Sequence, residues 1–347
     1  MKSYSQIIGI SILFIAAVFG YFFFIQDKGP EFTFEEKITD TIIDIETNTM
    51  DAAEEINNKK TTSSREVSVT DGTKHSIPLD KILSGGPQKD GIPSIDAPKF
   101  ISADDADFLI GSDVGLGLSL NGEDRFYPYQ ILVWHEIVND TIGDTPVLVT
   151  YCPLCATGIV FDRRVGGETQ EFGVSGRLWQ SNLLMYNRGK EESLWSQVLG
   201  EAVVGEHTGE KLAIVRSSTV RWEDWEREHK NTKVLSKSTG AVRLYGQDPY
   251  GEYYTSESVS FGATFNDDRL HPKAFVLGVE ISGAFKAYHK DAIIEGETKD
   301  SFAGVEVVIT KNSIGEVVMS VAGEELSYTG GFWFSWLAVH PETELHK

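Results

Sequence analysis

The chain has 347 residues, of which 41% are hydrophobic and 11% aromatic, enough for one large core or two ordinary ones. Acidic residues outnumber basic ones, 52 to 31, and the formal net charge is −21. A chain this acidic repels phosphate backbones, which argues against nucleic acid as a partner. Cys152 and Cys155 are its only cysteines, so a disulfide-dense secreted scaffold is excluded.

The first predicted element is a membrane-spanning helix. Residues 7–25 form an uncharged, mostly apolar run of 19 residues, which as a helix would rise roughly 28 Å. Lys2 precedes it, and it ends in Tyr21-Phe22-Phe23-Phe24-Ile25, where small residues would mark a cleavage site. We therefore predict that residues 1–25 are an uncleaved signal-anchor, with a cleaved signal peptide as the alternative. The positive flank predicts a single-pass protein of the cell membrane whose globular part is extracytoplasmic.

Two further segments follow the predicted anchor. Residues 26–75 are polar and acidic, which is typical of a solvated stalk. From residue 76 onward the composition becomes that of a globular protein, and we predict one β-rich domain over residues 76–347.

Within this domain, short β-prone runs alternate with turn signals such as Asn121-Gly122 and Gly166-Gly167. A helix is predicted over residues 221–229, capped by Thr219, with Trp222 and Trp225 on its buried face. No tandem repeat, alternating βαβα pattern or glycine-rich nucleotide motif is visible. The prediction is a mainly β, mostly antiparallel domain with one or two short helices. Its predicted strands are 147–151, 158–162, 171–175, 183–186, 276–281, 305–310 and 316–321.

Residues 134–197 carry the candidate chemistry. A turn centred near Gly143 would pair two strands and place His135 opposite Tyr151 or Cys152. Glu136 and Asp140 are acid–base candidates, although loop acids of this kind are usually solvated at the surface.

The Cys152-Pro153-Leu154-Cys155 motif has three interpretations. A soft-metal site would use His135, both thiolates and Met185, and these donors suit copper better than zinc. A dithiol redox centre is the second, although a turn and a strand follow the motif where thioredoxin-like enzymes have a helix. In the third, a local disulfide or two buried thiols only shape a turn, and Met185 belongs to the core.

Several words of the sequence resemble the domain of unknown function 3179 family, which occurs in extracytoplasmic proteins of archaea and bacteria. They are WHEIVND, TYCPLCATG, SNLLMYNR, SLWSQ, YGQDPY and WFSWLAVHPET. The resemblance extends over about residues 100–345 and implies membership and location, but no activity. The positions that match its most recognisable words are His135, Cys152, Cys155, Asn182, Met185 and Trp195.

Two functions remain open from the sequence. One is a membrane-anchored extracytoplasmic domain with a copper or redox site at His135, Cys152 and Cys155. The other is a non-catalytic module that contacts cell-envelope components and uses the cysteine pair as a local disulfide. The sequence does not decide whether the protein is an enzyme.

Overall fold

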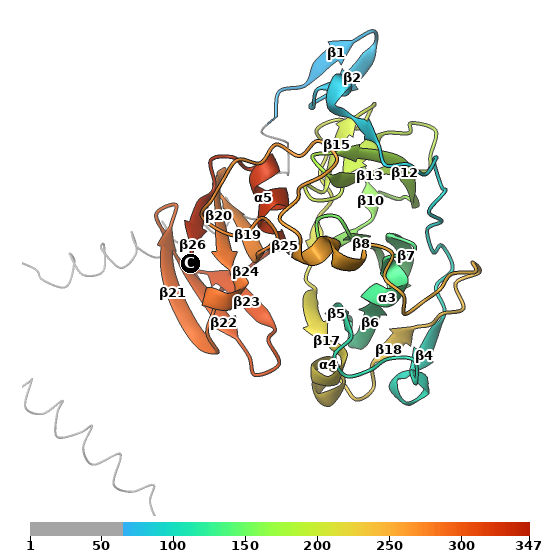
Figure 1. Cartoon of the computed structure of the whole chain (residues 1–347), viewed down its shortest axis with the longest axis vertical. Coiled ribbons are helices and arrows are strands. Elements are labelled where there is room, and N and C mark those ends of the chain that lie inside the picture. Colours follow the sequence, from blue (N-terminus) through green and yellow to red (C-terminus); the bar gives the residue numbers. More distant parts are fainter. Residues whose placement is uncertain (1–64) are drawn as a thin grey trace, which may run out of the picture. The chain divides into compact units, whose positions relative to one another are not determined.

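The short apolar runs of the sequence form strands, because β-branched and aromatic side chains pack well on a pleated surface. A computed structural model describes residues 65–347, shown in Figure 1. All seven predicted strands are present, with ends that differ by a few residues from the prediction. The described residues are mainly β, with antiparallel sheets and three short α-helices where one or two were predicted.

The first half of the fold contains a four-stranded and a five-stranded sheet. The four-stranded sheet has the order β16 (Ile214–Val215), β9 (Thr157–Asp162), β8 (Thr145–Cys152) and β7 (Ile137–Ile142). The five-stranded sheet has the order β17 (Ser218–Arg221), β5 (Val114–Leu120), β6 (Glu123–Pro128), β18 (Lys233–Leu235) and β4 (Phe100–Ser102). Two helices follow strands of the second sheet, α3 (Tyr129–Leu132) after β6 and α4 (Trp222–Glu228) after β17.

The second half contains two four-stranded sheets, drawn in orange and red in Figure 1. One has the order β25 (Thr329–Phe332), β19 (Phe275–Ile281), β20 (Ala284–His289) and β26 (Glu344–His346). The other has the order β21 (Gly296–Phe302), β22 (Val305–Lys311), β23 (Val317–Val321) and β24 (Glu324–Leu326). Helix α5 (Trp333–Val339) follows β25, and a 3₁₀-helix, η4 (Lys290–Ala292), follows β20.

A seven-stranded sheet completes the β structure. Its order is β1 (Ser68–Thr70), β2 (Thr73–His75), β15 (Glu201–Val204), β14 (Leu194–Ser196), β13 (Asn182–Asn187), β12 (Phe172–Trp179) and β3 (Leu83–Ser84). The remaining elements are β10 (Arg164–Val165), β11 (Glu168–Thr169), η1 (Leu79–Lys81), η2 (Ala103–Asp105) and η3 (Gly251–Thr255). Strands β10–β15 lie in sequence between β9 and β16, so they form an insertion in the first half.

The two halves have the same topology, so the expectation that the chain has no repeat is wrong. The order β17-β5-β6-β18 matches β25-β19-β20-β26, and in each set only the last pair is parallel. The order β7-β8-β9-β16 likewise matches β21-β22-β23-β24. In the second half, β23 leads directly into β24 with no counterpart of the insertion.

The same side-chain packing recurs in both halves. Trp225 of α4 covers Gly117, and Trp336 of α5 covers Gly278. Each indole donates a 2.9 Å hydrogen bond to a threonine hydroxyl seven residues later, Thr232 or Thr343. The predicted core role of the helical tryptophans is therefore confirmed. The helix begins after Arg221 instead of at a Thr219 cap.

An acid paired with a cation and a tyrosine is also repeated, buried in the first half and partly buried in the second. Asp140 of β7 accepts hydrogen bonds from Arg125 and from the Tyr127 hydroxyl. Asp300 of β21 pairs in the same way with Lys286, at 2.7 Å, and with Tyr288, at 2.9 Å. The expectation that Asp140 is a solvated loop acid is therefore wrong, because its strand continues to Ile142 and an arginine neutralises it inside the core.

The predicted anchor over residues 7–25 lies outside the described residues, as does most of the predicted stalk. Within residues 65–347, none of the helices is long and apolar enough to cross a membrane. The end of the predicted stalk, residues 68–75, forms the hairpin β1–β2 at the edge of the seven-stranded sheet. The division of the chain at residues 25 and 75 stays a prediction.

We expect Gly117→Ala to lower the free energy of unfolding by about 1–3 kcal/mol, because overpacking strains a filled core. A methyl group at this position would lie 2.3 Å from the indole of Trp225. Ser119→Ala, at an exposed position on the same strand, should change the free energy by less than about 0.5 kcal/mol. Urea unfolding followed by tryptophan fluorescence measures both. Equal effects of the two substitutions would contradict a structural role for this contact.

Candidate functional site

The Cys-x-x-Cys motif forms the turn between β8 and β9. Cys152 is the last residue of β8, and the amide of Cys155 donates a 3.1 Å hydrogen bond back to its carbonyl. Ala156 has a φ of 48°, in the left-handed region, and this reverses the chain into β9. The motif is thus followed by a turn and a strand, as predicted. Both cysteines are free and buried.

The two thiols share one acceptor. The carbonyl of Ser181 lies 3.8 Å from Sγ of Cys152 and 3.4 Å from Sγ of Cys155. Ser181 precedes β13 and has a φ of 62°, so the turn out of the insertion directs its carbonyl at the cysteines. Nδ2 of Asn182 donates to Cys155 at 3.6 Å. The insertion therefore supplies the carbonyl that both sulfurs share and the side-chain amide that contacts Cys155.

The two thiols differ in acidity. Burial raises the pKa of Cys152 well above its ordinary value, and the neighbouring Cys155 raises it further. Burial also acts to raise the pKa of Cys155, but hydrogen bonds from Cys152, Ser335 and Asn182 outweigh it and lower this pKa. Cys155 is therefore the thiol that ionises first, and the Cys152 thiol donates a hydrogen bond to the resulting thiolate.

A buried hydrogen-bond network around the Gln197 amide holds Asn182 in its position beside Cys155. Oε1 of Gln197 accepts from the Thr157 hydroxyl at 2.7 Å and from Nδ2 of Asn182 at 2.9 Å. Its Nε2 donates to the Thr150 hydroxyl at 2.9 Å. Because all of these partners are buried, the network fixes the amide that faces Cys155.

Glu136 is the acidic residue of the site. Its side chain is buried and makes no hydrogen bond or ion pair within residues 65–347. Its carbonyl accepts a 2.8 Å hydrogen bond from the amide of Tyr151, which places it beside the strand end that carries Cys152. Burial raises the pKa of Glu136 well above its ordinary value, and the charge of a Cys152 thiolate would raise it further. Burial therefore favours the protonated carboxyl, and the expectation of a solvated acid is wrong.

The His135 side chain forms its hydrogen bonds with residues other than the two cysteines. The register of β7 and β8 places it opposite Cys152, one of the two predicted positions. The strand begins only at Ile137, however, and Glu136 has a φ of 59°, which turns the chain away. The imidazole hydrogen-bonds the carbonyl of Pro93 at 2.8 Å and the hydroxyl of Tyr245 at 2.7 Å. Burial lowers its pKa, so it is a neutral ring with both nitrogens engaged.

Met185 belongs to the apolar core around the cysteines. It lies on β13, opposite Val174 and Trp195, and is fully buried. The same cluster of buried residues contains Cys152 and Cys155. No group of three or more His, Cys, Asp or Glu side chains within residues 65–347 is arranged to hold a metal ion.

A segment that connects the two halves covers the thiols. Tyr250, Tyr253 and Tyr254, in and before η3, pack against the cluster that contains both cysteines. The hydroxyl of Tyr253 donates to the carbonyl of Leu154, inside the motif, at 2.9 Å. From the second half, the amide of Phe332 donates to the carbonyl of Cys155 at 2.8 Å. Two separate parts of the chain thus close the site.

A lysine holds this cover in place. The ammonium of Lys273 donates to the carbonyls of Ser256 and Ser258 at 2.6 and 2.8 Å. It also lies 3.8 Å from the centre of the Tyr253 ring. Burial lowers the pKa of Lys273, which is consistent with an ammonium enclosed by the cover.

Sequence reasoning missed Gln197 and the tyrosine cover, and it named Glu136 as an acid–base candidate but expected a solvated side chain. Gln197 ends the word SLWSQ, and Tyr250 ends the word YGQDPY, so both lay within words quoted for the resemblance. Nothing in the local sequence distinguishes Glu136 from a surface acid. Its burial is decided by chain segments distant in sequence.

We expect Lys273→Met to increase the alkylation rate of the buried thiols by iodoacetamide about tenfold or more, because local opening limits access to them. Lys237→Met is the matched control, since Lys237 also lies over an aromatic ring, Phe108, but at an exposed position. Mass spectrometry of labelled peptides from the folded full-length protein gives both rates. Identical rates in the two variants would show that Lys273 does not hold the cover.

A family model described as "Protein of unknown function (DUF3179)" matches residues 89–327. The matched region contains the cysteine turn, Glu136, the amide network and the tyrosine cover, and it spans more than half of the 347 residues. No curated protein and no solved structure matches the chain. The chain belongs to the DUF3179 family.

Proposed function

We propose that the chain carries a dithiol–disulfide redox centre at Cys152 and Cys155, on an extracytoplasmic domain anchored by residues 7–25. The observation that carries the proposal is that the two free thiols converge on the carbonyl of Ser181. A disulfide is stable in an oxidising compartment outside the cytoplasm, which is where the predicted anchor would place the domain.

The acidity of the two thiols supports a direction for the chemistry. Cys155, with its lowered pKa, is the thiolate that attacks an oxidised partner and forms a mixed disulfide. Cys152 then attacks the Cys155 sulfur, which releases the reduced partner and closes the intramolecular disulfide. The complete oxidation removes two electrons and two protons from the dithiol.

Glu136 supports the handling of one of these protons. The raised pKa of its buried carboxyl favours the protonated form, and the side chain has no partner within the described residues other than the nearby cysteine. When the disulfide is reduced, the carboxyl can protonate the Cys152 thiolate, whose high pKa makes it a strong base. A protonated acid at this position avoids placing two negative charges together in the core.

Access is the remaining requirement. Structural buried cysteines are inert, whereas redox-active ones must meet a partner. Here the cover of Tyr250, Tyr253 and Tyr254 rests on a segment without strands, between β18 and β19. Its opening would expose the motif without unfolding either half.

A soft-metal centre at His135, Cys152, Cys155 and Met185 is the second candidate. The convergence of two thiols favours it, because paired thiolates select Cu(I). The hydrogen bonds of His135 and the packing of Met185 restrict this candidate to the two sulfurs, unless the site rearranges.

The first test is a redox titration of the full-length protein in dithiothreitol and glutathione buffers. After acid quenching and labelling in denaturant, we expect both thiols to be lost together in one two-electron transition. Cys152→Ser and Cys155→Ser should not show this transition, because the remaining cysteine of each variant can form only a mixed disulfide with glutathione. Thiols that stay reduced throughout, in a protein that binds Cu(I) about a hundredfold more tightly than Cys152→Ser does, would favour the metal centre instead.

The second test concerns Glu136 and pH. Because its pKa is raised in the folded protein, the native state binds more protons than the unfolded state, and stability falls as pH rises above about 4.5 towards the folded pKa. We therefore expect reduced Glu136→Gln to exceed the wild type in unfolding free energy by about 1–3 kcal/mol more at pH 8 than at pH 5. Glu168→Gln, at an exposed position, is the control and should show no such change. Urea unfolding at the two pH values measures the difference, and parallel behaviour of both variants would contradict a buried neutral Glu136.

A further inference from the structure

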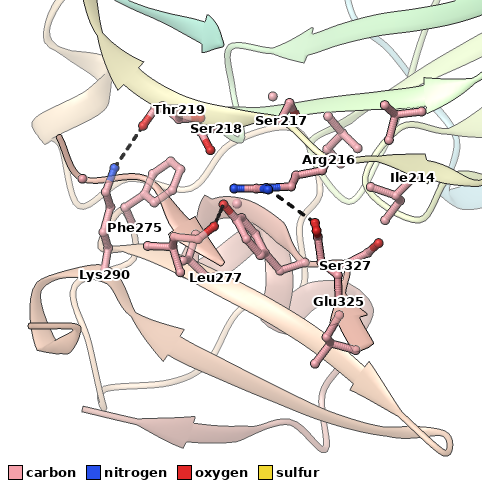
Figure 2. A pocket seen from close by; sticks show the side chains of 18 residues that line it. Ile214, Arg216, Ser217, Ser218, Thr219, Phe275, Leu277, Lys290, Glu325 and Ser327 are labelled. Atoms are coloured by element: carbon pink, nitrogen blue, oxygen red, sulfur yellow. Dashed lines mark hydrogen bonds and ion pairs between the residues drawn. The ribbon is translucent and has the colours of Figure 1, made fainter. Parts of the chain in front are cut away.

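A cavity of about 30 Å³ lies between the two halves of the fold, away from the cysteines (Figure 2). From the first half it is lined by the start of β9 and by residues 214–219. From the second half it is lined by β19, by η4 and by the chain between β24 and β25. A space of this size holds about two water molecules.

The cavity is cationic in a chain whose net charge is −21. Two cations line it, Arg216 from the first half and Lys290 from the second, against a single acid, Glu325. Figure 2 shows the guanidinium of Arg216 reaching across the space between the two sets of strands.

Lys290 lacks a counter-ion. Within residues 65–347 no carboxylate lies within ion-pair distance of its ammonium, and its one hydrogen bond is a long one, 3.4 Å, to the carbonyl of Thr219. The side chain is half-buried, and burial and the charges of Lys311 and Arg221 lower its pKa, outweighing the opposite effect of the Asp291 carboxylate. A bound anion would restore the balance of charge around this ammonium.

Arg216 is also only weakly engaged. Its Nε lies 3.5 Å from Oε1 of Glu325, and both side chains are about half exposed, 47% and 48%, where such pairs contribute little. The terminal nitrogens of the guanidinium have no partner in the described part of the chain, and neither do the hydroxyls of Ser217 and Ser327. A guanidinium presents parallel donors that match the two oxygens of a planar oxyanion.

The two halves differ at the position of Lys290. Lys290 begins the helix that follows β20, and its counterpart after β6 is Tyr129. The hydroxyl of Tyr129 forms a 2.9 Å hydrogen bond with the hydroxyl of Thr219. The second half therefore has the cation Lys290 at the position where the first half has Tyr129, a neutral side chain whose hydroxyl is already hydrogen-bonded.

We propose that this cavity binds a small planar oxyanion of the carboxylate or carbonate class, held between Arg216 and Lys290. Such an anion pairs with the guanidinium through two oxygens and with the ammonium as a point charge. Because each half contributes one cation, the anion links the halves. This site is independent of the chemistry proposed for the cysteines.

The test is isothermal titration of the full-length protein with formate and with bicarbonate, at constant ionic strength set by chloride. We expect saturable binding of at least one of them, weakened about tenfold or more in Lys290→Gln and in Arg216→Gln. Lys299→Gln, which removes an exposed lysine paired with Glu306 outside the cavity, should bind within about twofold of the wild type.

Arg216 is exposed, so Arg216→Gln gives a readable result even if Lys290→Gln does not fold. The absence of saturable binding of both anions would overturn the proposal. Undiminished binding by Arg216→Gln would overturn it as well, because the anion would then bind elsewhere.

Discussion

An indole packed flat on a glycine of a neighbouring strand holds each half of this fold together. Trp225 covers Gly117 in the first half and Trp336 covers Gly278 in the second, at distances that leave no room for a side chain on either glycine. Each indole also packs against the histidine at the end of its helix, stacked in the first half and tilted by 46° in the second, with ring centres 3.7 and 4.1 Å apart. This packing fixes a short helix against the sheet, so that the strand that follows returns parallel to β6 or β20. A helix of seven residues would not be stable without such tertiary contacts.

The two halves share a topology, but only one of them carries the dithiol. The turn between β22 and β23, which corresponds to the cysteine turn, contains no cysteine. Only the first half has the insertion whose turn at Ser181 and whose Asn182 contact the two sulfurs. The second half instead closes the site, through the hydrogen bond from Phe332 to the carbonyl of Cys155. The two halves are therefore not equivalent. The first half carries the dithiol, and the second half helps to cover it.

The ionisable groups of the interior differ in whether an opposite charge is paired with them, and this difference separates structural groups from candidate functional ones. Asp140 and Asp300 are each paired with a cation and a tyrosine, so their burial is compensated. Glu136 is buried beside a thiol with no such compensation, and Lys290 lines a cavity without an ion pair to any carboxylate of residues 65–347. Uncompensated groups cost folding free energy, and they concentrate where a protein binds or transfers charge. These two residues therefore mark the dithiol and the cavity as separate places of interest.

The sequence by itself determined the class of the fold, the seven strands named from it, the tryptophan helix and the turn that brings Cys155 back towards Cys152. These are local properties, because side-chain alternation, turn residues and helix spacing act over a few residues. It also contained the repeat, as Trp222-Trp225-His229-Thr232 and Trp333-Trp336-His340-Thr343 with identical spacing, but low similarity elsewhere and the insertion of β10–β15 obscured it. Only the tertiary structure decided that His135 binds Pro93 and Tyr245, that Glu136 is buried beside Cys152, and that tyrosines from residues 250–254 cover the thiols. The reason is physical: these contacts join segments up to about a hundred residues apart, and burial and pKa depend on what the rest of the chain packs against a group.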